Sequence, residues 1–181
     1  MDSEKKDEIT LRPPREDDLA MLDSLVQDPE ETGEFGWFGW YNPLGWRKSW
    51  DENHLIGSDG GTLIVMRDDA RLGLVNWRRR PATPAAYNWE IGIALLRVAR
   101  GHGYGTQAQR LLIRYLFAHT AVHRIFATTE VGNTAEQRAL EKVGFTREGV
   151  LRGVGWRDGA WRDGVMFSVL RTDPAAASSP A

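Results

Sequence analysis

The sequence predicts a single α/β domain built on a mixed, mostly antiparallel sheet. Its 181 residues fit one domain, because domains typically take about 100–200 residues. Segments of alternating apolar residues, which indicate strands, flank two segments with the periodicity of amphipathic helices. Short turn signals join several neighbouring strands and therefore favour antiparallel hairpins. An apolar fraction of 41% and a charged fraction of 27% are typical of a folded domain.

The first half of the chain is expected to hold most of the strands. A short strand at 9–11 stops at Pro13, and a helix over 16–26 follows, with acidic residues in its first turn where the helix dipole favours them. Residues 28–50 are expected to be irregular or to contain short helices. The strands that follow are expected at 62–66, 72–77 and 87–95, the first two forming a hairpin through a turn at 68–70.

The second half is expected to contain two helices and three strands. The helix over 106–119 carries a clear apolar stripe, and a second helix runs from Asn133 or Thr134 to Val143, where Gly144 is a plausible C-terminal cap. Strands are expected at 124–131, 145–156 and 164–170. The last two are joined by a segment containing Asp-Gly, which is typical of a hairpin turn.

Composition limits the classes of function. The chain has no cysteine and four scattered histidines, so we expect neither disulfides nor a metal site. No apolar run is long enough to span a membrane and the charged N-terminus has no signal-peptide core, so a cytoplasmic location is expected. Residues 1–7 are expected to be a flexible arm, 8–171 the domain, and 172–181 a disordered tail.

The strongest local motif is the glycine-rich segment 100–106, which follows a strand and opens a helix. Glycines let the backbone bend and approach a ligand closely. The first N–H groups of a helix lack intrahelical partners and lie at the positive end of its dipole, so they suit a phosphate group. Arg100 adds a positive charge. The alternative interpretation is a tight turn whose helix start is already satisfied.

The motif and its surroundings resemble the GCN5-related N-acetyltransferases (GNAT family). Arg100, Gly103 and Gly105 form an Arg-x-x-Gly-x-Gly loop after the strand segment Trp-Glu-Ile-Gly-Ile, similar to the acyl-CoA-binding loop of that family. Segment 129–135 resembles its fifth strand and the start of its last helix, and 141–149 resembles its EKxGFxxEG segment. The resemblance covers roughly 8–171. It is greatest for the ribosomal-protein alanine N-acetyltransferase (RimJ/RimL-like) group.

The resemblance implies a fold and a cofactor. The fold is a single GNAT-like domain with helices on both faces of the sheet and a splayed pair of fourth and fifth strands, between which the pantetheine arm of acetyl-CoA or another acyl-CoA lies. An acceptor amine then attacks the thioester directly. The cofactor-binding residues implied here are Ile91, Ile93, Leu95, Arg100, Gly101, His102, Gly103, Tyr104, Gly105, Thr106 and Asn133.

The catalytic groups of the family are not at their usual places. Members often carry a tyrosine on the last helix, where this chain has Leu140, and a carboxylate after the EG segment, where it has Gly153-Val154-Gly155. Glu90, on the strand beside the expected reaction centre, is the best remaining general base, or else a structural carboxylate that accepts from arginine. Glu136 is interpreted as a capping carboxylate rather than a catalytic one. A water chain could also take the proton.

Aromatic residues gather in segment 35–50. Glycines separate rigid rings there, as in a pocket wall for an apolar or planar acceptor, although some of the rings are expected in the core. The residues expected to bind the acceptor are Trp37, Phe38, Trp40 and Tyr41. Trp77 and Trp89 alternate within strands and are expected to be core residues.

The resulting prediction is an acyl-CoA-dependent N-acetyltransferase acting on a small-molecule amine or a peptide N-terminus. One alternative is a donor other than CoA, either a carrier protein or an aminoacyl-tRNA; otherwise nucleic acid is not an expected partner, since the net charge is only −2. Another is a CoA-binding regulatory module without turnover. No membrane partner is expected, and the resemblance admits a homodimer.

Overall fold

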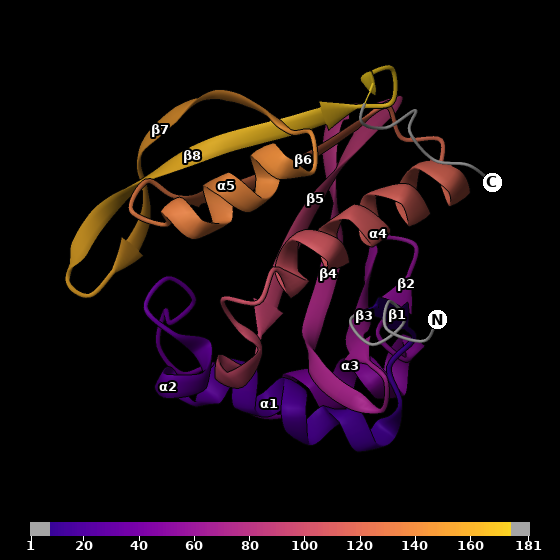
Figure 1. Ribbon diagram of the computed structural model, residues 1–181, viewed down its shortest axis with the longest axis vertical. Coiled ribbons are helices and arrows are strands. Elements are labelled where there is room, and N and C mark those ends of the chain that lie inside the picture. The colour runs from indigo at the N-terminus through magenta and orange to yellow at the C-terminus, as the bar shows by residue number, and fades with distance from the viewer. Residues whose placement is uncertain (1–7, 175–181) are drawn as a thin grey trace, which may run out of the picture.

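A computed structural model describes residues 8–174. The chain forms one sheet in the order β1-β3-β4-β5-β6-β8-β7, with the short β2 paired to β3 (Figure 1). All pairs are antiparallel except β5 with β6. The strands are β1 (Ile9–Arg12), β2 (Ile56–Gly57), β3 (Gly60–Arg67), β4 (Ala70–Thr83), β5 (Ala86–Leu95), β6 (Arg124–Glu130), β7 (Thr146–Arg157) and β8 (Ala160–Leu170). The helices are η2 (Glu16–Asp18), α1 (Leu19–Gln27), α2 (Pro29–Thr32), α3 (Gly45–Asn53), η3 (Arg97–Ala99), α4 (Tyr104–His119) and α5 (Thr134–Lys142).

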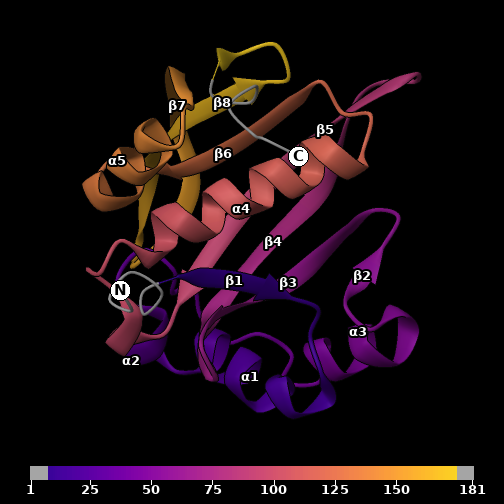
Figure 2. The same cartoon turned by 45° about the vertical axis from the view of Figure 1, so that its right-hand side comes forward.

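Helices cover both faces of the sheet, as expected. The apolar side chains of α4, including Leu112 and Leu116, pack with those of α5 on one face. Leu22 and Leu25 of α1 pack on the opposite face, against Ile64 and other residues of β3 and β4. Figure 2 shows the sheet between α4 and α1. Residues that alternate along β4, β5 and β6 therefore face either the α4 side or the α1 side.

The centre of the sheet is where the two halves part. β5 pairs with β6 only at Trp89 with Ile125 and at Glu90 with Phe126. Beyond these positions the two strands diverge, β5 staying with β4 and β6 with β8. Figure 1 shows this divergence. Because the short β2 was not among the expected strands, β5 and β6 correspond to the expected fourth and fifth strands. The expected splayed pair is therefore present.

Most element boundaries match the expectations. Helix α4 starts at Tyr104, two residues earlier than expected, because Gly103 takes a left-handed φ of 79° and acts as its N-cap. The irregular segment contains the short helices α2 and α3. The last hairpin turns at Asp158 and Gly159, which both have positive φ, as a two-residue turn of this type requires. Trp77 and Trp89 are buried as expected.

The expected terminal segments fall mostly outside the described residues. The arm at 1–7 and residues 175–181 of the tail lie beyond them. Residues 172–174 are described and form a turn, in which the N–H of Asp173 donates to the Leu170 carbonyl. Within the described part of the chain, no helix is long and apolar enough to cross a membrane.

A bidentate ion pair ties β7 to the rest of the sheet. The two terminal guanidinium nitrogens of Arg124 on β6 donate to Glu148 on β7, each at 2.5 Å, and the Ser168 hydroxyl of β8 donates to the same carboxylate. These hydrogen bonds hold the pKa of Glu148 at about 2, below its ordinary value. The ionised carboxylate is therefore favoured by folding.

The Glu148 contacts predict an acid-sensitive contribution to stability. Because the pKa is lower in the folded state, the stabilisation is complete above about pH 4.5 and is lost as the pH falls toward about 2. We expect Glu148→Gln to lower the free energy of unfolding at neutral pH and to lose this effect in acid. Urea unfolding at a series of pH values measures it, with Glu141→Gln, an exposed carboxylate on α5, as the control. An equal deficit at pH 3 and pH 7 would contradict this assignment.

Candidate active site

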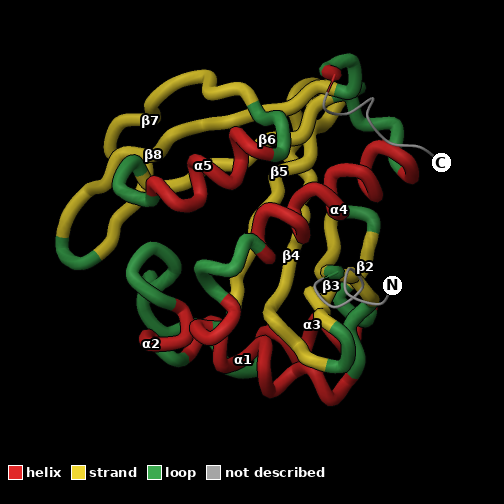
Figure 3. The backbone as a smooth tube through the Cα atoms, in the orientation of Figure 1, coloured by secondary structure: helices red, strands yellow, loops and turns green. Residues whose placement is uncertain are grey.

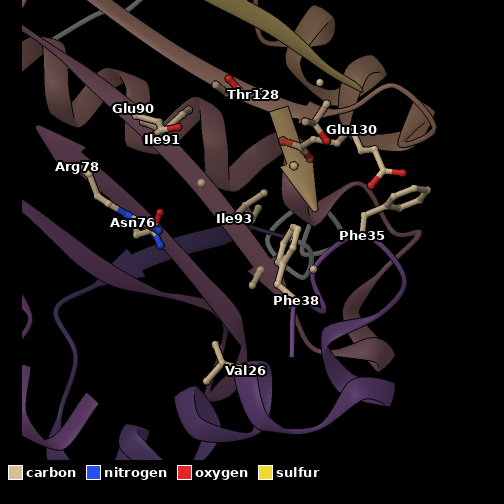
Figure 4. A pocket seen from close by; sticks show the side chains of 18 of the residues that line it. Val26, Phe35, Phe38, Asn76, Arg78, Glu90, Ile91, Ile93, Thr128 and Glu130 are labelled. Atoms are coloured by element: carbon tan, nitrogen blue, oxygen red, sulfur yellow. The ribbon is translucent and has the colours of Figure 1, made fainter. Parts of the chain in front are cut away.

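A cleft of 870 Å³ lies where β5 and β6 diverge. It is bounded by the two strands, by the segment between α1 and α3, and by the β7–β8 hairpin (Figure 4). Among its lining residues are Val26, Phe35, Phe38, Tyr41, Trp46, Asn76, Arg78, Arg80, Glu90, Ile91, Ile93, Thr128, Glu130, Asn133, Glu136, Arg157, Arg162 and Asp163. The cleft therefore joins the polar ends of several strands to an aromatic wall.

The β6-facing edge of β5 is open along the cleft. The N–H of Leu96, just after β5, donates to the carbonyl of Leu72 on β4. Because the backbone groups of a strand alternate in direction, those of Ile91, Ile93 and Leu95 point away from β4 and toward the gap. The Leu95 carbonyl already accepts from Arg100 Nε at 2.9 Å. Ile91 and Ile93 thus offer backbone groups to a chain-like ligand in the gap.

The loop before α4 leaves its nitrogens free. The first hydrogen bond of α4 runs from the Gln107 N–H to the Gly103 carbonyl. Residues 101–103 precede α4 and 104–106 form its first turn, so the helix itself provides no acceptor for their backbone N–H groups. Within the described chain, these N–H groups donate to no other acceptor either. Gly101 and Gly103 have φ of 80° and 79°, and a Cβ at either would meet nothing within 4 Å. The structure therefore differs from the alternative interpretation, in which the N–H groups at the helix start are already hydrogen-bonded.

The side chains of this loop differ from expectation. The Arg100 guanidinium donates to the carbonyls of Leu95 and Glu31. It therefore anchors the loop to α2, and these donors are not directed toward a ligand at the free N–H groups. Figure 3 shows the loop beside α2. Tyr104 is buried in the core, where its hydroxyl accepts from Arg67, and only its backbone faces the site. His102 is exposed and stacks on Tyr104 with ring centroids 5.4 Å apart.

Glu90 faces the cleft but is not isolated. Its neighbours Trp89 and Ile91 point into the α4 core, so Glu90 points to the α1 side. Arg80 Nε donates to Glu90 Oε2 at 2.6 Å. The side chain is about one quarter exposed, at 26%. The carboxylate accepts from an arginine and also lines the cleft, so this placement fits both the structural and the catalytic interpretation of Glu90.

Glu136 is the second carboxyl of the cleft. The helix-capping role belongs to Asn133, whose Oδ1 accepts from the Glu136 N–H at 3.2 Å and whose amide nitrogen donates to Thr129. The Glu136 side chain is turned instead toward α4, where it accepts from Gln109 Nε2 at 2.7 Å. Burial raises its pKa, an effect that the Gln109 hydrogen bond opposes. Glu136 is therefore not the capping carboxylate that the sequence suggested.

A buried ion pair that sequence analysis missed forms one wall. Arg157 on β7, 5% exposed, donates through Nε and Nη2 to the two oxygens of Glu130 at 2.9 and 2.8 Å. These bonds lower the pKa of Glu130. The guanidinium also lies 5.5 Å from the ring centroid of Phe35. No sequence signal linked residues 27 positions apart.

The aromatic segment is divided between the cleft and the outside. Phe38 and Tyr41 line the cleft, together with Phe35 and Trp46. Trp37 and Trp40, which were also expected to bind the acceptor, are not among the residues that line it. They meet edge to face with centroids 6.0 Å apart, and Trp40 is 82% exposed. Segment 33–44 has no regular period, so the sequence could not show which rings point inward.

Three consecutive arginines lie far from the glycine loop. Arg78, Arg79 and Arg80 lie near the β4–β5 turn, at the opposite end of β5 from the glycine loop. Arg79 pairs with Asp59 at 3.5 Å and Arg80 with Glu90. Within residues 8–174, no three histidine or acidic side chains are grouped so as to hold a metal ion.

Open backbone groups along a splayed strand pair lie beside a helix N-terminus whose N–H groups are free, an arrangement suited to a chain-like ligand with a phosphate group. The family model for the acetyltransferase (GNAT) domain matches residues 8–146. The chain therefore belongs to the GNAT acetyltransferase family.

Individual relatives agree with this placement. The probable N-acetyltransferase YjcK of Bacillus subtilis is 34% identical over 68% of this chain and 65% of its own length. The alanine N-acetyltransferase of ribosomal protein uS5 from Escherichia coli is 24% identical over 82% of this chain and 64% of its length. The match thus spans slightly less than two thirds of each relative. The spermidine N-acetyltransferase of Vibrio cholerae, solved with CoA and spermine, has the same fold, with a TM-score of 0.77, 18% identity and coverage of 91% of this chain and 96% of that one.

The free loop predicts a specific effect of Gly105→Val. A Cβ there would lie 3.5 and 3.6 Å from Ile93 and Leu95, an ordinary contact that the fold tolerates. The further methyl groups of valine would fill the space beside the free N–H groups. We expect acetyl-CoA affinity to fall at least tenfold, or about 1.4 kcal/mol, with little loss of fold. Isothermal titration calorimetry measures the affinity.

A matched control separates binding from helix propensity. Ala118→Val places the same side chain on an exposed position of α4, far from the loop. It is expected to leave acetyl-CoA affinity unchanged. Unchanged affinity in Gly105→Val would show that the loop does not hold the cofactor. Gly103→Val is a less clean test, because its left-handed φ adds backbone strain.

Proposed function

We propose that this protein is a cytoplasmic enzyme that transfers an acetyl group from acetyl-CoA to a primary amine. The observation that carries the proposal is the set of unpartnered backbone N–H groups at 101–106, which lie next to β5, where Ile93 lines the cleft and also contacts Gly105. Such groups bind a diphosphate through hydrogen bonds and the helix dipole. The cleft then leads along β5 to a chamber lined by carboxylates and aromatic rings.

The chain offers separate contacts for each part of acetyl-CoA. The N–H groups of Gly103, Gly105 and their neighbours would hold the diphosphate, and the free edge of β5 at Ile91 and Ile93 would hold the pantetheine arm. Acetyl-CoA, when bound, supplies a thioester carbonyl that an amine attacks directly. The protein contributes orientation, since it fixes donor and acceptor in one cleft.

Two carboxyls in unlike environments divide the proton transfers between them. Glu90, held by Arg80, is the proposed general base for the acceptor's ammonium group. Glu136 is the proposed proton source for the leaving sulfur, because burial favours its protonated form. Pairs of groups whose environments differ in this way commonly supply the acid and the base of one reaction. Glu136 would thus take the role of the tyrosine that many family members carry, and Glu90 would take the role of the carboxylate after the EG segment.

The free loop favours acetyl-CoA over the alternative donors. A diphosphate is the group that a helix N-terminus with unpartnered N–H groups binds best. The Arg78–Arg80 segment, which could have contacted an RNA-borne donor, lies at the other end of β5 and is partly neutralised by Asp59 and Glu90. Turnover separates the proposal from a regulatory module that only binds CoA.

The direct test is an acetylation screen. The protein is incubated with acetyl-CoA and a panel of small amines, amino acids and N-terminal peptides, and both CoA release and product mass are measured. We expect CoA binding in thermal-shift assays and acetylation of at least one amine class. Binding without transfer to any amine would contradict the catalytic proposal and support the regulatory module.

Glu90→Gln is expected to lower kcat at neutral pH by about 100-fold, as loss of a general base does, with acetyl-CoA affinity unchanged. The isosteric amide keeps the size of the side chain and removes its basicity. Steady-state kinetics between pH 6 and pH 10 measure the effect. Rates equal to those of the native enzyme at every pH would remove Glu90 from the mechanism.

Glu136→Gln is expected to lower kcat and to change the shape of its pH profile. The native rate should decline on the alkaline side as Glu136 loses its proton, at a pH above the ordinary value for glutamate. The variant should lack this decline. If Glu136 is only structural, the variant will keep the native kcat and the same alkaline limb.

A further inference from the structure

The charges that line the cleft do not cancel locally. The lining includes four arginines, Arg78, Arg80, Arg157 and Arg162, and four acidic residues, Glu90, Glu130, Glu136 and Asp163. Arg80 is paired with Glu90, and Arg157 takes both oxygens of Glu130. Glu136 is bound to Gln109, and burial favours its uncharged form. Arg78 and Arg162 thus form no ion pair within the described chain, although the nearby charge of Arg162 helps to lower the pKa of Glu130.

Arg162 is the more deeply placed of the two. It lies on β8 opposite Gly155 of β7, on the same face as Gly164, which pairs with Glu130. Its Nε is buried and has no hydrogen-bond partner within the described chain. No ion pair joins its guanidinium to a described acidic group, and the nearby Asp163 instead accepts from the Gly153 N–H at 2.7 Å. A buried, unpartnered guanidinium nitrogen is costly unless a ligand completes its contacts.

Arg78 extends the positive character along the other side of the cleft. It lies on β4 as the cross-strand neighbour of Glu90 and is exposed. Figure 4 shows its side chain directed along β4 toward Asn76. Glu90 accepts from Arg80 rather than from Arg78, and Arg78 forms no ion pair within residues 8–174. Both unpaired cations therefore face the space that an acceptor would occupy.

We propose that the acceptor is a small primary amine that also carries a carboxylate, as a free amino acid does, and that Arg162 binds this carboxylate. The planar guanidinium matches a carboxylate through two parallel hydrogen bonds. Phe35 and Phe38 would contact the apolar part of the same molecule. This inference rests on the proposed acetyl transfer and adds its substrate class.

The same charges disfavour the other amine classes. A polyamine has only positive groups and would meet two unpaired arginines. A peptide N-terminus has a neutral amide in place of the carboxylate and would leave Arg162 without a partner. A site built for a charged group rejects an analogue that lacks it, because its own polar atoms are then left unsatisfied.

The test compares amino acids with their own amides. Each free amino acid of a standard panel, its α-amide, and spermidine are offered to the native enzyme with acetyl-CoA, and CoA release gives kcat/KM. We expect the preferred amino acid to exceed its amide at least tenfold. Arg162→Gln should lower kcat/KM for the acid at least tenfold, leave that for the amide nearly unchanged, and keep acetyl-CoA affinity. Arg162→Lys keeps the charge and loses the planar guanidinium. Its kcat/KM for the free acid should lie between those of the native enzyme and of Arg162→Gln.

The control is Arg152→Gln, which removes an exposed arginine of β7 outside the cleft and should keep the native preference. If amides, peptides or spermidine are acetylated as well as the free acids, or if Arg162→Gln keeps the preference, the substrate class is wrong while acetyl transfer stands. If no amine releases CoA, the proposed function fails and this inference fails with it. The comparison in the native enzyme decides the question even if a variant does not fold.

Discussion

The central cleft of this protein depends on how briefly β5 and β6 pair. Two residues of each strand are in register, and then each strand follows a different partner, β4 on one side and β8 on the other. A sheet normally satisfies its backbone groups continuously, and unpaired groups are costly when buried. Here the interruption leaves one edge of β5 open within the domain. The helix that crosses from β5 to β6 begins next to this edge with its own N–H groups free, so the strand edge and the helix start lie side by side.

The charged groups around this surface are organised by pairing and burial. Arg157 and Glu130 form a buried pair that joins the β7–β8 hairpin to β6 beside the cleft. A second pair, Arg80 with Glu90, lies near the β4–β5 turn. Glu136 has an amide partner rather than a cation, which is why burial dominates its pKa. A buried carboxyl, a carboxylate held by an arginine and a guanidinium without an ion pair therefore line one cavity, and each has different nearest neighbours.

Periodicity and turn chemistry made the fold predictable from the sequence. The alternation in 87–95, the stripe of the 106–119 helix and the Asp-Gly turn are local signals, and each element formed close to its expected bounds. Side-chain directions outside regular structure were not predictable. Trp37 and Trp40 lie in a segment without a period, so nothing local distinguished them from Phe38. The direction of Arg100 depends on carbonyls as far as 69 positions away, and Arg162 becomes notable only once the tertiary pairing of Arg157 is known.

The claim that matters most is that the amides at the start of α4 bind the diphosphate of CoA. Backbone ¹⁵N–¹H NMR tests it directly, by comparing the protein titrated with CoA and with pantetheine, which has no diphosphate. The account predicts that CoA shifts the amide resonances of 103–106 and slows their exchange with solvent, whereas pantetheine perturbs residues of β5 and leaves these amides unchanged. If CoA binds and the resonances of 103–106 stay where they are, the diphosphate lies elsewhere and the account is wrong.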